Sequence, residues 1–290
     1  MTSSKLKLWE IKWLQISSVV VPIDANLQIA MPQVVVTRPK QDANSWVQAL
    51  SDAGYQAIEF PLLELSEFLN AQTADEALIQ IKRSHAVMFV SANAVRFLAQ
   101  ALQSRSEWVA HFKNGARAWC TGPGTAAALI QIGVPLEQID QPALQAKQLD
   151  SEALWEVVSP QVTPDMNVLF VRGADESGAA AGRDWLAQEL EKSQVRVGTI
   201  AAYQRSAAQL TSFQKERVHQ LIAEGAIWLF SSSAALQNLM AQCPEANWAD
   251  AKATVTHPRM ADLAQKKGWG FVSIAPPGIH SMLASIKSLT

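Results

Sequence analysis

Two short stretches of the sequence, MFVSANAV at residues 88–95 and WLFSSSAAL at residues 228–236, share one design. Each is an apolar run that ends in a turn with small hydroxyl residues and then continues as a helix-forming segment. A continuous apolar run is typical of a strand buried on both faces, whereas a strand with one exposed face alternates polar and apolar residues. Both stretches therefore predict a strand–turn–helix unit of a parallel sheet.

The same unit recurs along most of the chain. It begins with VVV at 34–36, which precedes a segment whose Trp46, Val47 and Leu50 share one helical face before Gly54. Further apolar runs that lead into turns and helices lie at residues 86–90, 116–120, 167–171, 226–230 and 253–255. This alternation predicts an α/β fold with parallel sheets covered by helices on both faces.

The number and order of the units indicate two sheets and a diverged internal repeat. Roughly ten units exceed the five or six strands of an ordinary doubly wound sheet. The SANAV turn is followed by GPGTAAAL at 122–129, and SSSAAL is followed by HPRMADLA at 257–264. In both places a turn with small hydroxyls therefore precedes a turn that contains proline.

Bulk composition excludes several classes of function. A formal net charge of -2 over 290 residues gives no global basic field, so no nucleic-acid partner is predicted. Cys120 and Cys243 are far apart, with neither metal-type spacing nor a disulfide framework. A cytoplasmic location is the interpretation that fits them.

Residues 1–32 differ from the rest of the chain. Their apolar stretch is interrupted by Pro22 and Asp24, is too short for a membrane span, and leads to no clean signal-peptide cleavage site. We expect a poorly ordered N-terminal extension, with a peripheral amphipathic segment as the alternative.

The turns themselves predict an anion site. Ligands of parallel α/β sheets bind beyond the carboxyl ends of the strands, where helix N-termini present free N–H groups. Each helix start contributes about 0.3–1 kcal/mol toward a nearby anion, so several together could hold a polyanion. The polar residues at these strand ends are Arg38, Ser91, Asn93, Thr125, Ser231 and Ser232. Each hydroxyl can also serve as a helix N-cap, and the two roles are compatible.

No cofactor or metal ion is predicted. GPGTAA at 122–127 matches a dinucleotide-binding loop only weakly, because Glu137 and Asp140 follow too soon to contact a ribose. The five histidines are scattered, and the sequence contains neither a zinc-protease motif nor a phosphate-binding Walker loop.

Several segments stand in order from about Gln33 to the C-terminus: VVVTRPKQDANSWVQALSDAGYQAIEFPLLEL, FVSANAVRFL, WCTGPGTAAAL, LFVRG with GRDWLAQEL, IAAYQRS, LFSSSAAL and ATVTHPRMADLAQKKG. As an ordered set, they resemble uroporphyrinogen-III synthase. The resemblance implies two flavodoxin-like parallel-sheet domains joined by a two-stranded linker, the first domain being discontinuous. On this chain, domain 1 would comprise residues 33–60 and 206–290, domain 2 residues 66–197, and the linker residues 61–65 and 198–205.

The resemblance also implies an activity. The family cyclises hydroxymethylbilane, a linear tetrapyrrole with eight carboxylates, to uroporphyrinogen III in haem biosynthesis. Water is lost and ring D is inverted through a spiro intermediate, without a cofactor. Hydroxymethylbilane synthase would be the upstream enzyme, and a monomer is the default expectation.

Site residues follow from the matching motifs. Tyr203 in IAAYQR would help the hydroxyl group leave, as a hydrogen-bond donor or general acid; the alternative is an amphipathic tyrosine at a strand end. Arg183 in GRDWL and Arg38 in TRP would bind carboxylates, although a surface salt bridge is the alternative for Arg38. The substrate-binding turns would be formed by Ser91, Asn93, Thr125, Ser231 and Ser232.

One turn departs from the family pattern. Where the family has I-G-P-T-T-A, this chain has THPRMA at 256–261, so close backbone approach to a ligand is in doubt there and Arg259 would bind a carboxylate directly. The departure leaves a catalytically impaired tetrapyrrole- or anion-binding homologue as the alternative function.

Overall fold

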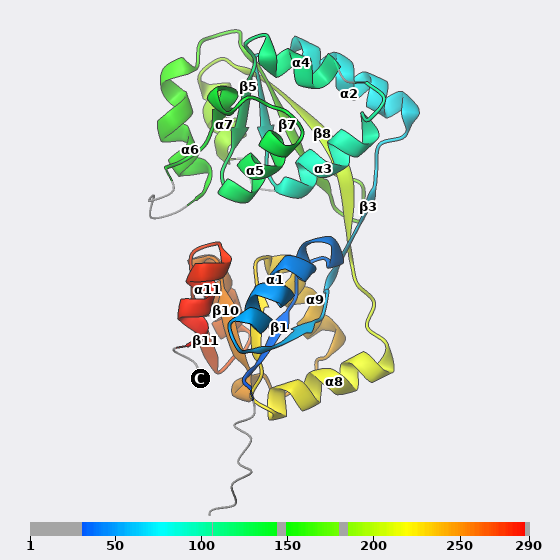
Figure 1. Ribbon diagram of the computed structural model, residues 1–290, viewed down its shortest axis with the longest axis vertical. Coiled ribbons are helices and arrows are strands. Elements are labelled where there is room, and N and C mark those ends of the chain that lie inside the picture. Colours follow the sequence, from blue (N-terminus) through cyan, green and yellow to red (C-terminus); the bar gives the residue numbers. More distant parts are fainter. Residues whose placement is uncertain (1–30, 106, 144–148, 180–184, 288–290) are drawn as a thin grey trace, which may run out of the picture. The chain divides into compact units, whose positions relative to one another are not determined.

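The computed structural model describes residues 31–290 except residues 106, 144–148, 180–184 and 288–290 (Figure 1). The N-terminal extension predicted for residues 1–32 therefore lies almost wholly outside the described residues. The described chain forms two β-sheets, each between its own helices (Figure 1).

The first sheet has five parallel strands in the order β11-β10-β9-β1-β2. Its strands are β1 (Gln33–Val36), β2 (Gln56–Glu59), β9 (Ile227–Phe230), β10 (Lys252–Val255) and β11 (Phe271–Ile274). Counted along this part of the chain the order is 2-1-3-4-5, as in flavodoxin. The direction of winding changes between β1 and β9, and a ligand is expected beyond the carboxyl ends of those two strands.

Helices cover both faces of this sheet. They are α1 (Lys40–Asp52), α8 (Ser212–Ala223), α9 (Ser233–Gln242), α10 (Pro258–Lys266) and α11 (Ile279–Ile286). Val34 and Val36 pack with α1 and α11, whereas Val35 packs with α8, α9 and α10. Successive strand residues thus enter opposite cores, which is why the sequence reads VVV and not as an alternating pattern.

The second sheet has six strands in the order β3-β8-β7-β4-β5-β6, and only the β3–β8 pair is antiparallel. Its strands are β3 (Leu63–Glu67), β4 (Ala86–Phe89), β5 (Arg117–Cys120), β6 (Ile139–Asp140), β7 (Asn167–Ala174) and β8 (Arg196–Ala207). When its five parallel strands β4, β5, β6, β7 and β8 are numbered 1 to 5 along the chain, their order in the sheet, read from β6, is 3-2-1-4-5. This order differs from that of the first sheet. The direction of winding changes between β4 and β7, so the ligand-binding end is expected there.

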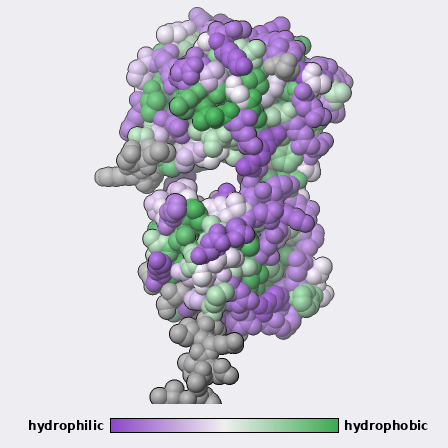
Figure 2. Space-filling model, in the orientation of Figure 1, coloured by the Kyte–Doolittle hydropathy of each residue, from purple (hydrophilic) through white to green (hydrophobic). Residues whose placement is uncertain are grey.

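This sheet is also buried on both faces. Phe89 and Leu98 belong to the core beneath α2 (Ala71–Arg83), α3 (Ala92–Ala101), α4 (Glu107–Lys113) and α5 (Pro123–Gln131). Met88 and Phe170 face the opposite core, beneath α6 (Ser151–Val158) and α7 (Trp185–Lys192). Hydrophilic residues cover most of the face seen in Figure 2, as expected for helices that turn their apolar sides to the sheets. The predicted α/β class with parallel sheets is confirmed.

The chain passes between the sheets twice. It enters the second sheet through β3 and leaves it through β8, and these strands pair from Leu63 with Ala207 to Glu67 with Tyr203. The linker segments predicted at 61–65 and 198–205 overlap these two strands, but β8 is continuous and also pairs with β7 along Arg196 to Gln204. The domain boundaries themselves stay a prediction.

The described residues contain neither a candidate membrane span nor a candidate metal site. No helix there has the length and apolar character needed to cross a membrane. No group of three or more His, Cys, Asp or Glu side chains there could hold a metal ion.

Both cysteines are predicted to be unreactive in the folded protein. Cys120 ends β5, and Cys243 follows α9; both are buried. Burial raises the pKa of the Cys120 thiol to about 12 and also raises the pKa of Cys243. Since the thiolate is the reactive form, iodoacetamide at pH 8 should label neither residue unless denaturant is added, as mass spectrometry would show. Rapid labelling of Cys120 in the native protein would contradict the buried position of this strand end.

Candidate active site

Three adjoining cavities lie at the carboxyl ends of the strands. Their volumes are about 600, 410 and 280 Å³, and Thr121 lines all three. Ser91 lines the largest and the smallest, while Ser231 and Thr256 line the largest and the intermediate one. The shared residues make the three cavities one connected site.

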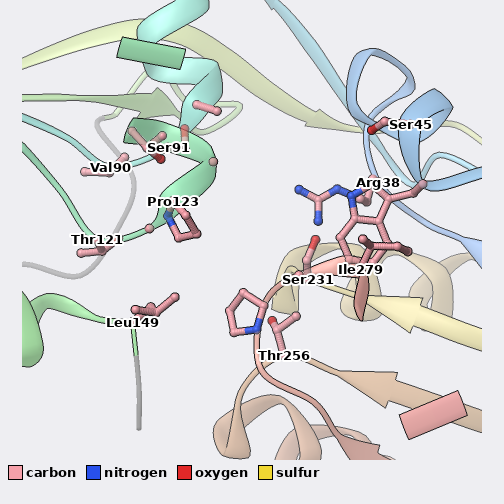
Figure 3. Close-up of a pocket in the computed structure, with 17 residues that line it drawn as sticks. Arg38, Ser45, Val90, Ser91, Thr121, Pro123, Leu149, Ser231, Thr256 and Ile279 are labelled. Carbon is pink, nitrogen blue, oxygen red and sulfur yellow. The ribbon is translucent and has the colours of Figure 1, made fainter. Parts of the chain in front are cut away.

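The largest cavity receives residues from both sheets (Figure 3). Ser91, Gly122 and Thr125 come from the turns after β4 and β5, and Arg38 and Ser231 from the turns after β1 and β9. The helices that begin at its rim are α3, α5 and α11, with N-caps Ser91, Gly122 and Gly278. Because the first N–H groups of a helix have no partner within it, these starts are suited to bind anions.

Arg38 is held beside this cavity. The neighbouring Thr37 is buried, and its hydroxyl donates a hydrogen bond of 2.6 Å to the Leu229 carbonyl, which ties the end of β1 to β9. The Arg38 guanidinium lies 4.8 Å from the centre of the Trp46 ring, a cation–π contact. Burial lowers the Arg38 pKa, while the Asp42 carboxylate acts in the opposite direction. Its Nε is buried and has no hydrogen-bond partner among the described residues.

Tyr203 lines the smallest cavity, which the second sheet alone forms. Only 5% of the tyrosine is exposed, and its ring stacks on Phe97 with 5.3 Å between the ring centres. Its hydroxyl lies 3.3 Å from Ser91 Oγ, which also accepts the Ala94 N–H at 3.1 Å as the N-cap of α3. Tyr203 and Ser91, both predicted from the sequence, thus meet at this cavity.

Comparison with known proteins identifies the family. The family model for uroporphyrinogen-III synthase HemD matches residues 44–284, most of the chain. The chain belongs to the uroporphyrinogen-III synthase family. A uroporphyrinogen-III synthase of Chlorobaculum parvum is 28% identical over 145 residues, which cover 50% of this chain and 54% of that protein. The match therefore spans only about half the length of that relative.

Solved structures of the same family share the fold. Uroporphyrinogen-III synthetase of Helicobacter pylori is similar with a TM-score of 0.57 at 17% identity, covering 90% of this chain and 100% of that one. A mutant uroporphyrinogen III synthase of Thermus thermophilus is similar with a TM-score of 0.54 at 14% identity, and the match covers 89% of this chain and 98% of that one.

In this member of the uroporphyrinogen-III synthase family, the THPRMA turn is organised by a histidine. His257 is the N-cap of α10, and its Nδ1 accepts the Arg259 N–H at 3.2 Å. The exposed side chain of Arg259 lines the intermediate cavity together with Ser231 and Ser233. The arginine predicted to compensate for the altered turn thus lies at the site.

The structure does not place three other predicted residues at these cavities. Asn93 lines none of the three cavities; its Nδ2 donates to Asp42 Oδ2 at 2.7 Å and its Oδ1 accepts from Arg96 at 3.0 Å. Ser232 is the N-cap of α9, without a side-chain capping bond, and also lines none of them. Arg183 lies outside the described residues. Substrate contacts of these three stay predictions.

Two arginines that line the candidate site were not predicted from the sequence. Arg172 near the end of β7 is 4% exposed, lies 5.2 Å from the centre of the Phe170 ring, and lines the smallest cavity together with Arg205 of β8. The sequence pattern that could have identified Arg172 is the LFVRG run itself, in which an arginine follows apolar residues of a strand. An arginine within a buried strand is rare unless its charge is compensated, and the carboxyl end of that strand is where ligands bind.

Proposed function

We propose that the chain is a uroporphyrinogen-III synthase that converts hydroxymethylbilane to uroporphyrinogen III, with loss of water and inversion of ring D. The observation that carries the proposal is the connected site, where helix N-termini and arginines from both sheets converge beside a tyrosine hydroxyl. Family membership supplies the reaction, and the site has the chemistry that such a substrate needs.

Carboxylate binding is the first task of this site. Four arginines of the described residues line it: Arg38, Arg172, Arg205 and Arg259. Guanidinium groups match carboxylates geometrically, and helix starts add N–H donors. These two kinds of donor can engage many of the eight carboxylates of a linear tetrapyrrole, although the chain as a whole is slightly acidic.

Departure of the hydroxyl group is the chemical step that a side chain can assist. The carbon–oxygen bond at the hydroxymethyl group breaks, the leaving oxygen takes a proton and departs as water, and the pyrrole nitrogen gives up its own proton, which leaves a neutral azafulvene. Tyr203 supplies the donor, since its hydroxyl lines the cavity beside Ser91. The substituted carbon of ring D then attacks to form the spiro intermediate, which fragments and recloses.

Selection of the inverted product is a matter of positioning. Without an enzyme the bilane closes uninverted, so the protein must hold the ends of the substrate where ring D is attacked at its substituted carbon. A preference of about 1.4 kcal/mol between two closures gives a tenfold excess of one isomer. A few well-placed carboxylate contacts are therefore enough to determine the outcome.

Replacing Arg38 with glutamine should weaken substrate binding. A charge-assisted hydrogen bond contributes roughly 1.5–3 kcal/mol, so KM for hydroxymethylbilane should rise at least about tenfold while kcat changes much less. Arg196→Gln is the matched control, because Arg196 is exposed and pairs with Asp165 away from the site. Steady-state kinetics measure both values, and an unchanged KM for Arg38→Gln would remove Arg38 from the binding site.

Complementation tests the proposed function in cells. A strain that lacks uroporphyrinogen-III synthase and requires added haem should grow without it when this chain is expressed. Growth that still requires haem, although folded protein accumulates, would contradict the proposal.

The remaining expectations are proposals of the same kind. We propose a cytoplasmic monomer with the domain boundaries and linker given above, supplied with substrate by hydroxymethylbilane synthase. The absence of metal-type or disulfide-type cysteine spacing supports the location. Spontaneous closure of the bilane to the wrong isomer supports rapid transfer from the upstream enzyme.

A further inference from the structure

Gly173 of β7 lies against the ring of Tyr203. A β-carbon added to Gly173 would lie 2.7 Å from both Cε2 and Cζ of the tyrosine and 3.1 Å from its hydroxyl oxygen. Carbon atoms in good contact are 3.5–4.0 Å apart, so any side chain here would have to displace the ring by roughly 1 Å. The glycine therefore provides space that the phenol occupies.

An irregularity in the sheet brings these two residues together. Arg172 pairs with Ala201, but the next residue, Gly173, pairs with Tyr203, so β8 contains one additional residue at this point. Such a bulge changes the direction in which the following side chains point, and bulges are frequent beside active sites. Here the additional residue places Tyr203 directly beside the glycine.

The rest of the phenol is also held in place. Phe97 of α3 stacks on the ring with an interplanar angle of 24°, and Ser91 Oγ lies 3.3 Å from the hydroxyl. The ring is thus confined by the Gly173 backbone, by Phe97 and by Ser91. Its hydroxyl borders the cavity that Arg172 and Arg205 also line.

We infer that Gly173 is a positioning residue for the proposed reaction: its lack of a side chain, together with the bulge, sets the place of the Tyr203 hydroxyl. The inference rests on the proposed function, because it gives Gly173 a role through Tyr203. A displacement of about 1 Å can reduce a rate about a hundredfold when geometry controls the reaction.

Tyrosine-selective NMR tests the positioning without any turnover. The chain has two tyrosines, Tyr55 and Tyr203, so ring-labelled protein gives two sets of signals, which Tyr55→Phe assigns. Gly173→Ala should shift the Tyr203 signals and leave those of Tyr55 in place. Gly198→Ala is the matched control in β8: its added β-carbon would meet two flexible side-chain ends, Leu169 Cδ1 at 3.2 Å and Gln80 Oε1 at 3.7 Å, so neither set of signals should move. Unmoved Tyr203 signals in Gly173→Ala would overturn the inference.

Kinetics test the consequence. Gly173→Ala should lower kcat for isomer III formation roughly ten- to hundredfold with KM within about threefold, while Gly198→Ala stays near wild type. When Tyr203 has already been replaced by phenylalanine, adding Gly173→Ala should lower kcat by less than about twofold, because the hydroxyl that Gly173 positions is absent. An equal loss in both backgrounds, or no loss at all, would overturn the inference. Wild-type protein that yields only isomer I would instead refute the proposed function, whatever the NMR result.

Discussion

Replacing Tyr203 with phenylalanine should slow uroporphyrinogen III formation about a hundredfold, the lower range for loss of a general acid. The substitution removes only the oxygen that lies 3.3 Å from Ser91 Oγ. The ring remains stacked on Phe97 in its buried place, so the free energy of unfolding should change little. Stopped assays that separate the product isomers measure the rate, and circular dichroism checks the fold.

Tyr55→Phe is the matched control for this prediction. Tyr55 is also buried, but it belongs to the core of the first sheet and lines none of the three cavities. Its replacement should leave the rate within about twofold of wild type, since the oxygen that it removes belongs to a residue outside the cavities. Equal rates for wild type and Tyr203→Phe would show that the hydroxyl takes no part in departure of the leaving group.

Replacing Gly270 with alanine should lower the free energy of unfolding by about 3 kcal/mol, the upper end of the usual cost of adding carbon atoms where there is no space for them. A β-carbon there would lie within bonding distance of the Ala249 carbonyl oxygen, a backbone atom that cannot rotate away. Ala249 follows Trp248, whose ring stacks on buried Trp269 at 5.0 Å between centres. Relief of the clash must therefore disturb this aromatic pair, which packs against Phe230 at the end of β9.

Urea denaturation followed by tryptophan fluorescence measures the loss. Gly124→Ala serves as the control, because a β-carbon there has no neighbour within 4 Å and Gly124 lies in α5. Its free energy of unfolding should stay within about 1 kcal/mol of wild type, with a gain favoured by helix propensity. A Gly270→Ala protein as stable as Gly124→Ala would contradict the packing of this corner.

The fold was largely predictable because its signal is local. Residues 34–36, 86–89 and 227–230 are unbroken apolar runs, and each forms a strand buried on both faces. Ser91, the N-cap of α3 after β4, and Gly122, the N-cap of α5 after β5, both line the largest cavity. Arg38 and Thr125 line the largest cavity for the same reason, since each directly follows a strand and its turn.

The details of the site depend on pairings that the sequence does not display. Asn93 was predicted to face substrate, yet its amide contacts Asp42, which is 51 residues away in the sequence. The bulge that opposes Gly173 to Tyr203 is a matter of register between two strands, and no local pattern encodes it. Arg172 was overlooked because it stands within a run that reads as buried strand.

The order of strands explains why residues that are far apart in the sequence line one site. Winding changes direction between β1 and β9 in one sheet and between β4 and β7 in the other. Arg38 and Ser231 follow the first pair, while Ser91 follows β4 and Arg172 lies near the end of β7. Ligand sites of parallel sheets form at such positions. The related stretches at 88–95 and 228–236 therefore contribute to one connected site, through Ser91 and Ser231.

The isomer composition of the product shows whether this protein directs the inversion of ring D. Freshly made hydroxymethylbilane should be incubated with increasing amounts of the protein, and the products should be oxidised to the porphyrins and separated into isomers I and III. Isomer III should rise with protein concentration until it replaces isomer I almost entirely, whereas heat-denatured protein should leave isomer I alone. Isomer I as the sole product at every concentration of folded protein would contradict this prediction.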